Sequence, residues 1–321
     1  MVIPARNDGA GLPTAVRSSL AQSGVHVAQV LVCVGPSTDD TRAVAENLSL
    51  ENAVVRVLEN PAGGISDALN VGLAEVTSDV LVRVDARCNL APDYAMTALR
   101  CLAETGAANA GAVQVPVGHT PVQRAIAFAM AHTLGSGGAA YRAGKERSAV
   151  ETAFLGVFKT DALRAIGGWD TSFARNEDAE LNRRLILAGH EIWVDPALRV
   201  DYEPRKTLRA LGRQYLDYGW WRSRMVVQHR TLRPRQLAAP IIVLGFSGGV
   251  VLGLTVSPWF LVVPASYLVG LSVAAAVTAS ELPASERVYV PLAWATMHLT
   301  WGAGFLASLA RGSLGRARHS G

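Results

Sequence analysis

Two acidic sites in this sequence could carry chemistry together. Glu177 and Asp178 are adjacent, and Asp85 stands far earlier in the chain. Transfer of a group from a nucleotide needs a base for the acceptor and a place for the charged diphosphate, and carboxylates serve both purposes. The alternative for Glu177 and Asp178 is helix capping, because acidic side chains are favoured in the first turn of a helix.

The sequence pattern places both sites on predicted elements. Residues 175–184 open an amphipathic helix, in which Leu181 and Leu185 share one side. Asp85 follows the apolar run 80–84, which is typical of a strand buried on both faces of a parallel sheet. We therefore expect different elements of one sheet domain to supply the carboxylates.

The first part of the chain alternates predicted strands and helices. The strands are apolar runs at 2–3, 30–34, 54–58 and 80–84, and helices are predicted at 12–22, 41–48 and 66–75. This alternation predicts an α/β domain with a parallel sheet, whose sites lie at the carboxyl ends of the strands. The first strand is short, so we expect further strand residues upstream of Met1.

No glycine-rich nucleotide motif follows a predicted strand. The sequence has neither Gly-x-Gly-x-x-Gly after its first strand nor Gly-x-x-x-x-Gly-Lys-Ser/Thr anywhere, which argues against a dinucleotide-binding or P-loop domain. The glycine-rich run 135–138 follows a helical stretch at 121–134 and predicts either a basic flap over an anionic ligand or a plain surface loop. The residues behind it are Tyr141, Arg142, Lys145 and Arg147.

The composition indicates a membrane portion. Hydrophobic residues make up 50% of the chain, the mean hydropathy is +0.23, and nearly all long charge-free stretches lie after Leu237. The net charge of +4 comes largely from Arg clusters at 199–235 and at the end of the chain, which indicates a membrane surface and not a nucleic-acid face. Cys33, Cys88 and Cys101 lack metal-ligand spacing, which favours a reduced, cytosolic compartment.

Three late apolar stretches approach the ~20 residues that a bilayer span requires. They are 237–255, 258–279 and 288–310. The segment 207–236 mixes Arg with Tyr and Trp, which predicts an interfacial helix at anionic headgroups. The Arg-rich segment 207–236 precedes the membrane region 237–311, and the basic tail 312–321 follows it. Both ends of the membrane region are therefore predicted to be cytoplasmic. Three full spans cannot satisfy this prediction, which requires a re-entrant or interfacial segment or a translocated tail.

The sequence contains six short motifs, which are Val2–Asp8, Ser37–Thr41, Ala68–Leu73, Val82–Arg87, Gly167–Asp170 and Asn176–Asp178. In this order and spacing, they resemble the family 2 glycosyltransferases with the GT-A fold. The similarity is greatest to the succinoglycan-type membrane glycosyltransferases of bacterial exopolysaccharide assembly. It implies a Rossmann-like, mixed but mostly parallel sheet flanked by helices in a GT-A domain at 1–206, followed by transmembrane helices.

The resemblance implies an inverting transfer of a sugar from a nucleoside diphosphate donor, with a UDP-sugar favoured, to a polyprenyl-diphosphate-linked or other membrane acceptor. Asp178, with Glu177 beside it, would be the general base, and such proton transfer is worth ~10²- to 10⁴-fold. Asp85 would hold Mg²⁺ or Mn²⁺ against the donor diphosphate.

The same motifs imply binding residues. The donor and nucleotide would be contacted by Pro4, Asn7, Asp8, Asp39, Asn70, Asp85 and Arg87. The acceptor and sugar pocket would be formed by Trp169, Asp170, Arg205, Arg213, Gln214, Trp220 and Trp221. The alternative for Trp169 is a core aromatic side chain, and for Arg205 it is an ordinary surface charge.

Two positions depart from the family pattern. Val34-Gly35-Pro36 stands where most relatives have one or two aspartates that contact the base. Arg87 stands where the metal motif has a second Asp or a His, and a guanidinium cannot ligate a cation. Arg87 could pair with the diphosphate instead, so dependence on a divalent cation is either weak or satisfied by Asp85 as the one protein ligand.

The sequence thus predicts a multi-pass enzyme of the cell membrane whose catalytic domain faces the cytosol. Its expected partners are the nucleotide-sugar donor, a lipid-linked glycan acceptor, membrane lipids and an envelope polysaccharide assembly complex, without nucleic acid. Two alternatives stay open at this point. One is a processive polysaccharide synthase, and the other is a catalytically inactive homologue that binds a nucleotide sugar or tethers an assembly complex to the membrane.

Overall fold

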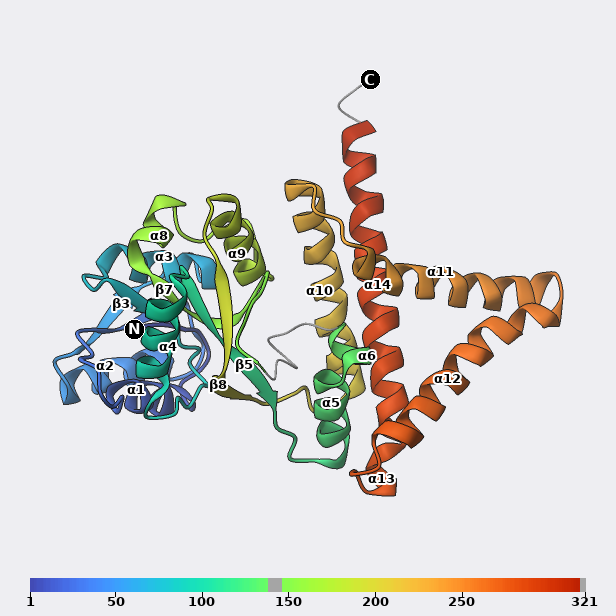
Figure 1. The fold of residues 1–321 in the computed structure, drawn as a ribbon, viewed down its shortest axis with the longest axis horizontal. Coiled ribbons are helices and arrows are strands. Elements are labelled where there is room, and N and C mark those ends of the chain that lie inside the picture. Colours follow the sequence, from blue (N-terminus) through green and yellow to red (C-terminus); the bar gives the residue numbers. More distant parts are fainter. Residues whose placement is uncertain (138–145, 318–321) are drawn as a thin grey trace. The chain divides into compact units, whose positions relative to one another are not determined.

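The computed structural model describes residues 1–137 and 146–317, with side chains up to residue 311 (Figure 1). The chain forms two compact units. The first comprises the described residues of Met1–Val115 and Ala139–Tyr202, and the second those of Pro116–Gly138 and Glu203–Gly321. Residues 116–138, which the sequence places inside a domain of 1–206, are therefore grouped with the C-terminal helices.

A parallel sheet opens the first unit. Its strands, in spatial order, are β1 (Val2–Ala5), β2 (Val30–Val34) and β3 (Val55–Glu59), and the chain alternates them with α1 (Leu12–Leu20), α2 (Thr41–Glu51) and α3 (Ile65–Glu75). Every residue of β2 is buried, as expected for an apolar strand covered on both faces. The predicted alternation of strands and helices is confirmed.

The second sheet has five strands, in the order β4-β7-β5-β8-β6. These are β4 (Val80–Val82), β5 (Asn109–Pro116), β6 (Ser148–Ala149), β7 (Phe154–Lys159) and β8 (Ile192–Tyr202), with helices α4 (Tyr94–Thr105), α8 (Thr160–Ala165) and α9 (Glu177–Leu187). β7 runs antiparallel to β4 and β5, and β6 runs antiparallel to β8. A parallel bridge between Val2 and Arg83 joins the two sheets. Taken together, the two sheets contain parallel and antiparallel strand pairs, as predicted. The share of antiparallel pairs is larger than expected.

Two apolar clusters hold the helices onto the sheets. Ile3 and Val32 lie in one cluster, whereas Val2 and Leu31 lie in the other, because successive strand residues point to opposite faces. The second cluster includes Leu181 from α9. The helix that carries Glu177 and Asp178 is therefore fixed by the core.

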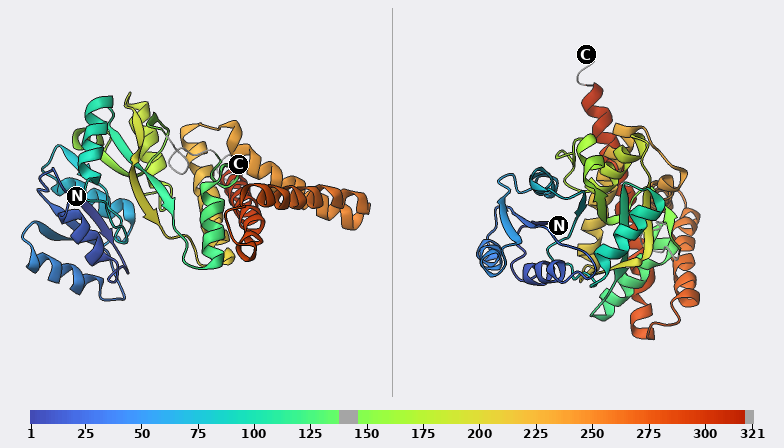
Figure 2. Two further views of the ribbon diagram at one scale, coloured as in Figure 1. Left: turned by 60° about the horizontal axis from the view of Figure 1, so that its bottom comes forward. Right: turned by 60° about the vertical axis from the view of Figure 1, so that its left-hand side comes forward.

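The second unit is helical (Figures 1 and 2). Its long helix α14 (Tyr289–Ala317) packs against α5 (Pro121–Ala131), α10 (Leu208–His229), α11 (Pro234–Thr255) and α12 (Val262–Thr278). The short elements are α6 (Thr133–Ser136), the 3₁₀ helix η1 (Pro258–Leu261) and α13 (Ala284–Arg287). α5 belongs to this unit because its apolar side is buried there, and the buried Trp294 donates from Nε1 to Ala129 O at 3.2 Å.

Two helical segments of the described chain are long and apolar enough to cross a membrane, namely α11 and Pro258–Thr278. The third predicted span, 288–310, forms most of α14, which does not meet the same criterion over its described residues. Thr296, His298 and Thr300 interrupt its apolar sequence. The described residues thus hold two candidate spans, and the third predicted span stays a prediction.

Candidate active site

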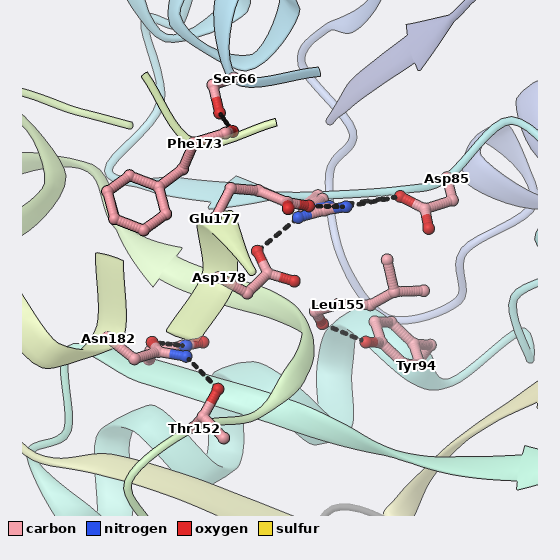
Figure 3. Close-up of polar contacts among 11 residues, drawn as sticks. Ser66, Asp85, Tyr94, Thr152, Leu155, Phe173, Glu177, Asp178 and Asn182 are labelled. Carbon is pink, nitrogen blue, oxygen red and sulfur yellow. Dashed lines mark hydrogen bonds and ion pairs between the residues drawn. The ribbon is translucent and has the colours of Figure 1, made fainter. Parts of the chain in front are cut away.

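A buried guanidinium gathers the three predicted carboxylates. The Arg83 side chain is 4% exposed, and its Nη2 lies 3.2 Å from Asp85 Oδ1 and 3.2 Å from Glu177 Oε1. Its Nη1 forms an ion pair with Asp178 Oδ1. In Figure 3, the carboxylates of Asp85, Glu177 and Asp178 approach this one group. The structure thus brings together the residues that the sequence assigned to the base and to the metal.

Main-chain bonds fix the segment that carries Arg83 and Asp85. Arg83 N donates to Gly156 O at 3.1 Å, which ties the end of β4 to β7. Cys88 N donates to Asp85 O at 2.9 Å, which turns the chain directly after the carboxylate. Asp85 is therefore presented at the carboxyl end of its strand, where sites of α/β sheets lie.

The first turn of α9 supplies the other two carboxylates. Asn176 precedes this helix with a φ of +61°, a left-handed conformation that asparagine tolerates better than most residues. Leu181 and Leu185 are fully buried, so the opposite side of the helix is anchored in the core. Glu177 and Asp178 are held toward Arg83 as a result.

Glu180 belongs to the same acidic cluster but has a structural role. It is fully buried and pairs with Arg184, with 2.7 Å between Oε1 and Nε. Arg184 Nη1 also donates to Ile166 O at 2.8 Å. This pair connects α9 to the end of α8, so not every acid of the cluster serves the site.

The electrostatics of the cluster favour a proton acceptor near neutral pH. Burial raises the pKa of Asp178 to about 7, the Arg83 charge opposes this rise, and the charges of Glu177 and Asp85 add to it. Burial acts against the charged form of Arg83, but the three carboxylates outweigh it and raise the pKa of Arg83 above its ordinary value. The site therefore holds one permanent cation and more than one negative charge.

β7 is irregular next to the cluster. Leu155 has a φ of +44°, and the pairing of β5 with β7 shifts register between Ala110 and Ala112. Tyr94 donates from its hydroxyl to Leu155 O at 2.9 Å (Figure 3). Bulges of this kind are frequent beside active sites, where they redirect the strand.

Asp85 is the most exposed of the three carboxylates, at 35% against 20% for Asp178 and 12% for Glu177. Its Oδ1 accepts from Arg83 Nε and Nη2, both at 3.2 Å, and in Figure 3 its other oxygen lies on the side away from these bonds. Among the described residues, no group of three or more His, Cys, Asp or Glu side chains could hold a metal ion. The geometry fits a cation that takes Asp85 as one ligand and the others from phosphate and water, as Mg²⁺ commonly does.

The loops after β1 and β2 are tied together by predicted donor-binding residues. Asn7, with a φ of +54°, accepts from Thr38 N at 2.8 Å. Asp39 accepts from Gly9 N at 3.2 Å, and its hydrogen bond from the Thr41 hydroxyl lowers its pKa. Pro4 lies within β1 in register with Cys33 of β2. These loops therefore form a rigid rim at the carboxyl ends of the first two strands.

Arg87 joins this rim. Its Nε lies 2.5 Å from Asp8 Oδ1, while the side chain as a whole is 75% exposed. Asp8 is thus paired with the residue that stands in the second metal-motif position. The rest of the guanidinium is open to solvent, where it can meet an anionic ligand.

Asn70 and Trp169 form a separate pair. Asn70 accepts from Trp169 N and donates to Trp169 O, both at 2.8 Å. Trp169 is 2% exposed and packs edge to face on Phe158 with 5.6 Å between ring centroids. These contacts fit the alternative interpretation of Trp169 as a core aromatic side chain. Asp170 accepts from Ser172 N at 2.9 Å in the following turn.

The remaining predicted acceptor residues belong to the second unit. Arg205 is exposed just before α10, and Gln214 on that helix donates to the Tyr218 hydroxyl at 2.8 Å. The guanidinium of Arg224 lies 4.9 Å from the Trp221 ring, and that of Arg311 lies 5.9 Å from the Trp220 ring. Arg213 is also exposed on α10. α10 therefore carries exposed basic residues and aromatic rings, and its interfacial role stays a prediction.

The predicted basic flap lies mostly outside the described residues, which omit Tyr141, Arg142 and Lys145. Arg147 is described, and its Nη2 pairs with Asp195 Oδ2 at 2.7 Å. Arg147 also pairs with Glu104. This residue therefore serves to link β6 with β8 and α4.

The sequence pattern did not single out Arg83, which pairs with all three carboxylates. Arg83 stands inside the apolar run 80–84, where a charged side chain is buried only if it is paired. That rule could have predicted carboxylate partners for Arg83, although not which ones.

The mixed strands flanked by helices have the GT-A glycosyltransferase fold. Residues 1–216 match the family model described as glycosyltransferase like family 2. The chain belongs to this family, and it is an enzyme that transfers a sugar.

Individual relatives agree with this assignment. The chain is 33% identical over 316 residues to the succinoglycan biosynthesis protein ExoA of Rhizobium meliloti, which covers 96% of this chain and 94% of ExoA. A mannosyltransferase from Pyrobaculum calidifontis, solved with GDP-Man and Mn²⁺, is similar with a TM-score of 0.61 at 18% identity, over 96% of this chain and 85% of that one. S. aureus TarS 1-349, solved with UDP, gives a TM-score of 0.51 at 14% identity, over 97% and 90%. The two solved structures support the fold.

Proposed function

We propose that this glycosyltransferase moves a sugar, with inversion, from a nucleoside diphosphate sugar to a polyprenyl-diphosphate-linked or other membrane acceptor, and that UDP is the favoured nucleotide. The observation that carries the proposal is the single guanidinium of Arg83, which holds a base candidate, Asp178, beside a cation-binding candidate, Asp85. The match to a succinoglycan biosynthesis protein supports a role in exopolysaccharide or cell-envelope glycan synthesis.

Asp178 takes the proton of the acceptor hydroxyl as its oxygen attacks the anomeric carbon on the face opposite the leaving diphosphate. A pKa of about 7 suits this role, because the carboxylate is then ionised in a useful fraction and still basic enough to accept a proton. Arg83 occupies Oδ1 of Asp178, which leaves Oδ2 as the acceptor. Glu177 adds negative charge beside it and so favours protonation.

Asp85 would hold Mg²⁺ or Mn²⁺, which would neutralise the charge that develops on the leaving nucleoside diphosphate. The exposed carboxylate supports this role, and so does the Mn²⁺ in the related mannosyltransferase complex. Arg87 is the candidate for a direct contact to the same diphosphate, because most of its guanidinium is exposed beside the loop that contains Asp8.

We also infer a membrane location with the catalytic unit facing the cytosol, where nucleotide sugars are found. The two candidate spans support this location, and the Arg-rich sequence before α11 supports the orientation. A lipid-linked glycan and an envelope polysaccharide assembly complex are the partners that such a location favours.

The test is release of nucleoside diphosphate by the detergent-purified protein from UDP-, GDP- and dTDP-sugars, with membrane lipid extract as acceptor. We expect turnover of one donor, strong loss in Asp178→Asn, and unchanged turnover in the control Asp201→Asn, whose side chain is exposed on β8. Chelation with EDTA, compared between wild type and Asp85→Asn, tests the metal assignment.

Each result decides one part of the proposal. Full activity of Asp178→Asn would remove the base assignment. Turnover that survives EDTA would indicate that Arg87, and not a cation held by Asp85, binds the diphosphate. Analysis of the anomeric configuration of the product by NMR tests inversion.

A further inference from the structure

α11 and α12 form an apolar hairpin that carries no charged residue beyond the first turn of α11. From Leu237 to Ser280 the sequence contains no Asp, Glu, Lys or Arg. The hairpin exposes large apolar side chains, among them Leu254 at 77%, Trp259 at 82% and Val277 at 72%. Soluble proteins rarely expose a continuous apolar surface of this extent, so we expect the apolar side chains of these helices to be buried against a partner or a bilayer.

The dimensions of the hairpin match a bilayer. α11 has 22 residues and Pro258–Thr278 has 21, which corresponds to roughly 30 Å each at about 1.5 Å per residue, close to the hydrocarbon thickness. The two helices approach closely near the turn, because a Cβ on Gly249 would lie 2.8 Å from Pro264 Cδ and one on Gly253 2.6 Å from Leu261. Figure 1 shows them leaving the α10–α14 pair and meeting again at a distant tip.

α14 does not share this environment, because it lies along a charged helix. A Cβ on Gly304 would overlap the carbonyl oxygen of Leu216, and one on Gly219 would overlap that of Trp301, so the two backbones are in contact. The helix that α14 touches, α10, carries charged residues along its length. These are Arg209, Arg213, Asp217, Arg222 and Arg224. Burial of these charged side chains in the hydrocarbon core would cost much free energy, so α10 stays outside the core. Because α14 packs along α10, α14 lies at the same depth.

The charges around the hairpin fit an anionic membrane surface on one side only. Arg230 and Arg233 precede α11, Arg235 lies in its first turn, and Arg311 lies on α14 against α10. The tip between α11 and η1 has no charge and presents Trp259, a residue that favours the membrane interface. Basic residues beside one end and an aromatic residue at the other are the pattern of a hairpin inserted from the basic side.

We propose that α11 and α12 are a two-span hairpin in the bilayer, that α10 and α14 lie at the anionic surface from which the hairpin enters, and that Trp259 sits in the opposite interface. The chain before α11 and the chain after α12 are then on the same side. This removes the conflict between three spans and two basic flanks. The inference rests on the proposed membrane location and adds the number of spans.

The experiment is labelling of single-cysteine reporters with a membrane-impermeant maleimide, in intact cells and after permeabilisation. The full chain is used with Cys33, Cys88 and Cys101 replaced by Ala, after confirming that this background is still inserted. We expect Ser257→Cys at the tip to react in intact cells. Ser280→Cys at the other end of the hairpin, and a cysteine added after Gly321, should react only after permeabilisation.

Two results would overturn the proposal. Reaction of the C-terminal cysteine in intact cells would make α14 a third span. Protection of Ser257→Cys in intact cells, with reaction after permeabilisation, would make the hairpin re-entrant and not spanning.

Extraction of membranes with alkaline carbonate separates this inference from the function. Release of the protein would disprove the membrane location itself. The expected labelling together with absent sugar transfer would leave the hairpin standing and refute only the catalytic proposal.

Discussion

At the scale of single residues, the site is organised by Arg83. One guanidinium contacts Asp85, Glu177 and Asp178, which come from two distant parts of the sequence. A buried cation of this kind orients its partners, and its loss leaves the mostly buried carboxylates of Glu177 and Asp178 without this counter-charge. Arg83 is therefore expected to matter for both folding and activity.

The variant Arg83→Lys separates these two effects. Lysine keeps the charge but has no planar fork, so it cannot contact three carboxylates in the same geometry. We expect activity to fall ~10- to 100-fold, as for other residues that orient catalytic ligands, with a smaller loss of stability than in Arg83→Met. For Arg83→Met we expect destabilisation of about 3–5 kcal/mol.

Denaturant unfolding and nucleoside diphosphate release measure the two effects. Arg164→Lys is the control, because Arg164 bonds only carbonyl oxygens outside the site. Equal activity of Arg83→Lys and wild type would show that the fork geometry is unimportant.

The pH dependence of activity follows from Asp178. Because the pKa of this carboxylate is raised to about 7, it is protonated and inactive as a base well below that pH. We expect kcat/KM to rise through about pH 7 and then to level off, with a slope near tenfold per pH unit on the acidic side. A profile that is flat from pH 5.5 to 8.5, measured with a stable donor, would contradict the assignment.

At the scale of elements, short side-chain bonds connect loops and helices that the sheet alone would not fix. The amide of Asn70 on α3 makes two 2.8 Å bonds to the backbone of Trp169, which follows α8. This pairing anchors the turn at Gly167 and Gly168, both of which have positive φ. The residue predicted to bind the donor is therefore engaged with the protein itself.

Asn70→Ala tests whether its role is structural or direct. Loss of two hydrogen bonds, which pair the main-chain N–H and C=O of Trp169, should destabilise the protein by about 1–3 kcal/mol. The control is Asn47→Ala, an exposed position of α2. If the donor KM changes while stability does not, Asn70 contacts the donor as first predicted.

Helix packing in the second unit gives a matched pair of glycine variants. Gly304→Ala places a methyl group on the carbonyl oxygen of Leu216, whereas Gly248→Ala on α11 meets nothing within 4 Å. We expect Gly304→Ala to lower the thermal stability in detergent, with an overpacking cost of about 1–3 kcal/mol. Gly248→Ala should leave it unchanged or raise it, since Ala favours helix by ~1 kcal/mol over Gly. An equal effect of both would refute the close contact of α10 and α14.

At the scale of the whole molecule, the number of candidate spans bears on the product. Two apolar helices cannot enclose a polysaccharide channel within one chain. We therefore expect the enzyme to add a single sugar to each acceptor and then release it. Mass spectrometry of the lipid-linked product at low enzyme and high donor concentration checks this, and a ladder of lengths would favour the processive alternative.

The sequence by itself determined the α/β class, the strand that precedes Asp85, the acidic helix start and the apolar stretches after Leu237. Each of these depends on local information: apolar periodicity, turn residues and run length. It also determined the GT-A resemblance, because six motifs occur in order.

Only the tertiary structure decided what those residues meet. The pairing of Arg83 with residues far along the chain, the burial of Trp169 and the grouping of 116–138 with the C-terminal helices all depend on contacts distant in sequence. A charged residue in an apolar strand must find a partner, but the chain alone does not say which carboxylate it finds. The same reason applies to α14: its apolar run suggests a span, whereas its contact with a charged helix supports the surface position that we propose.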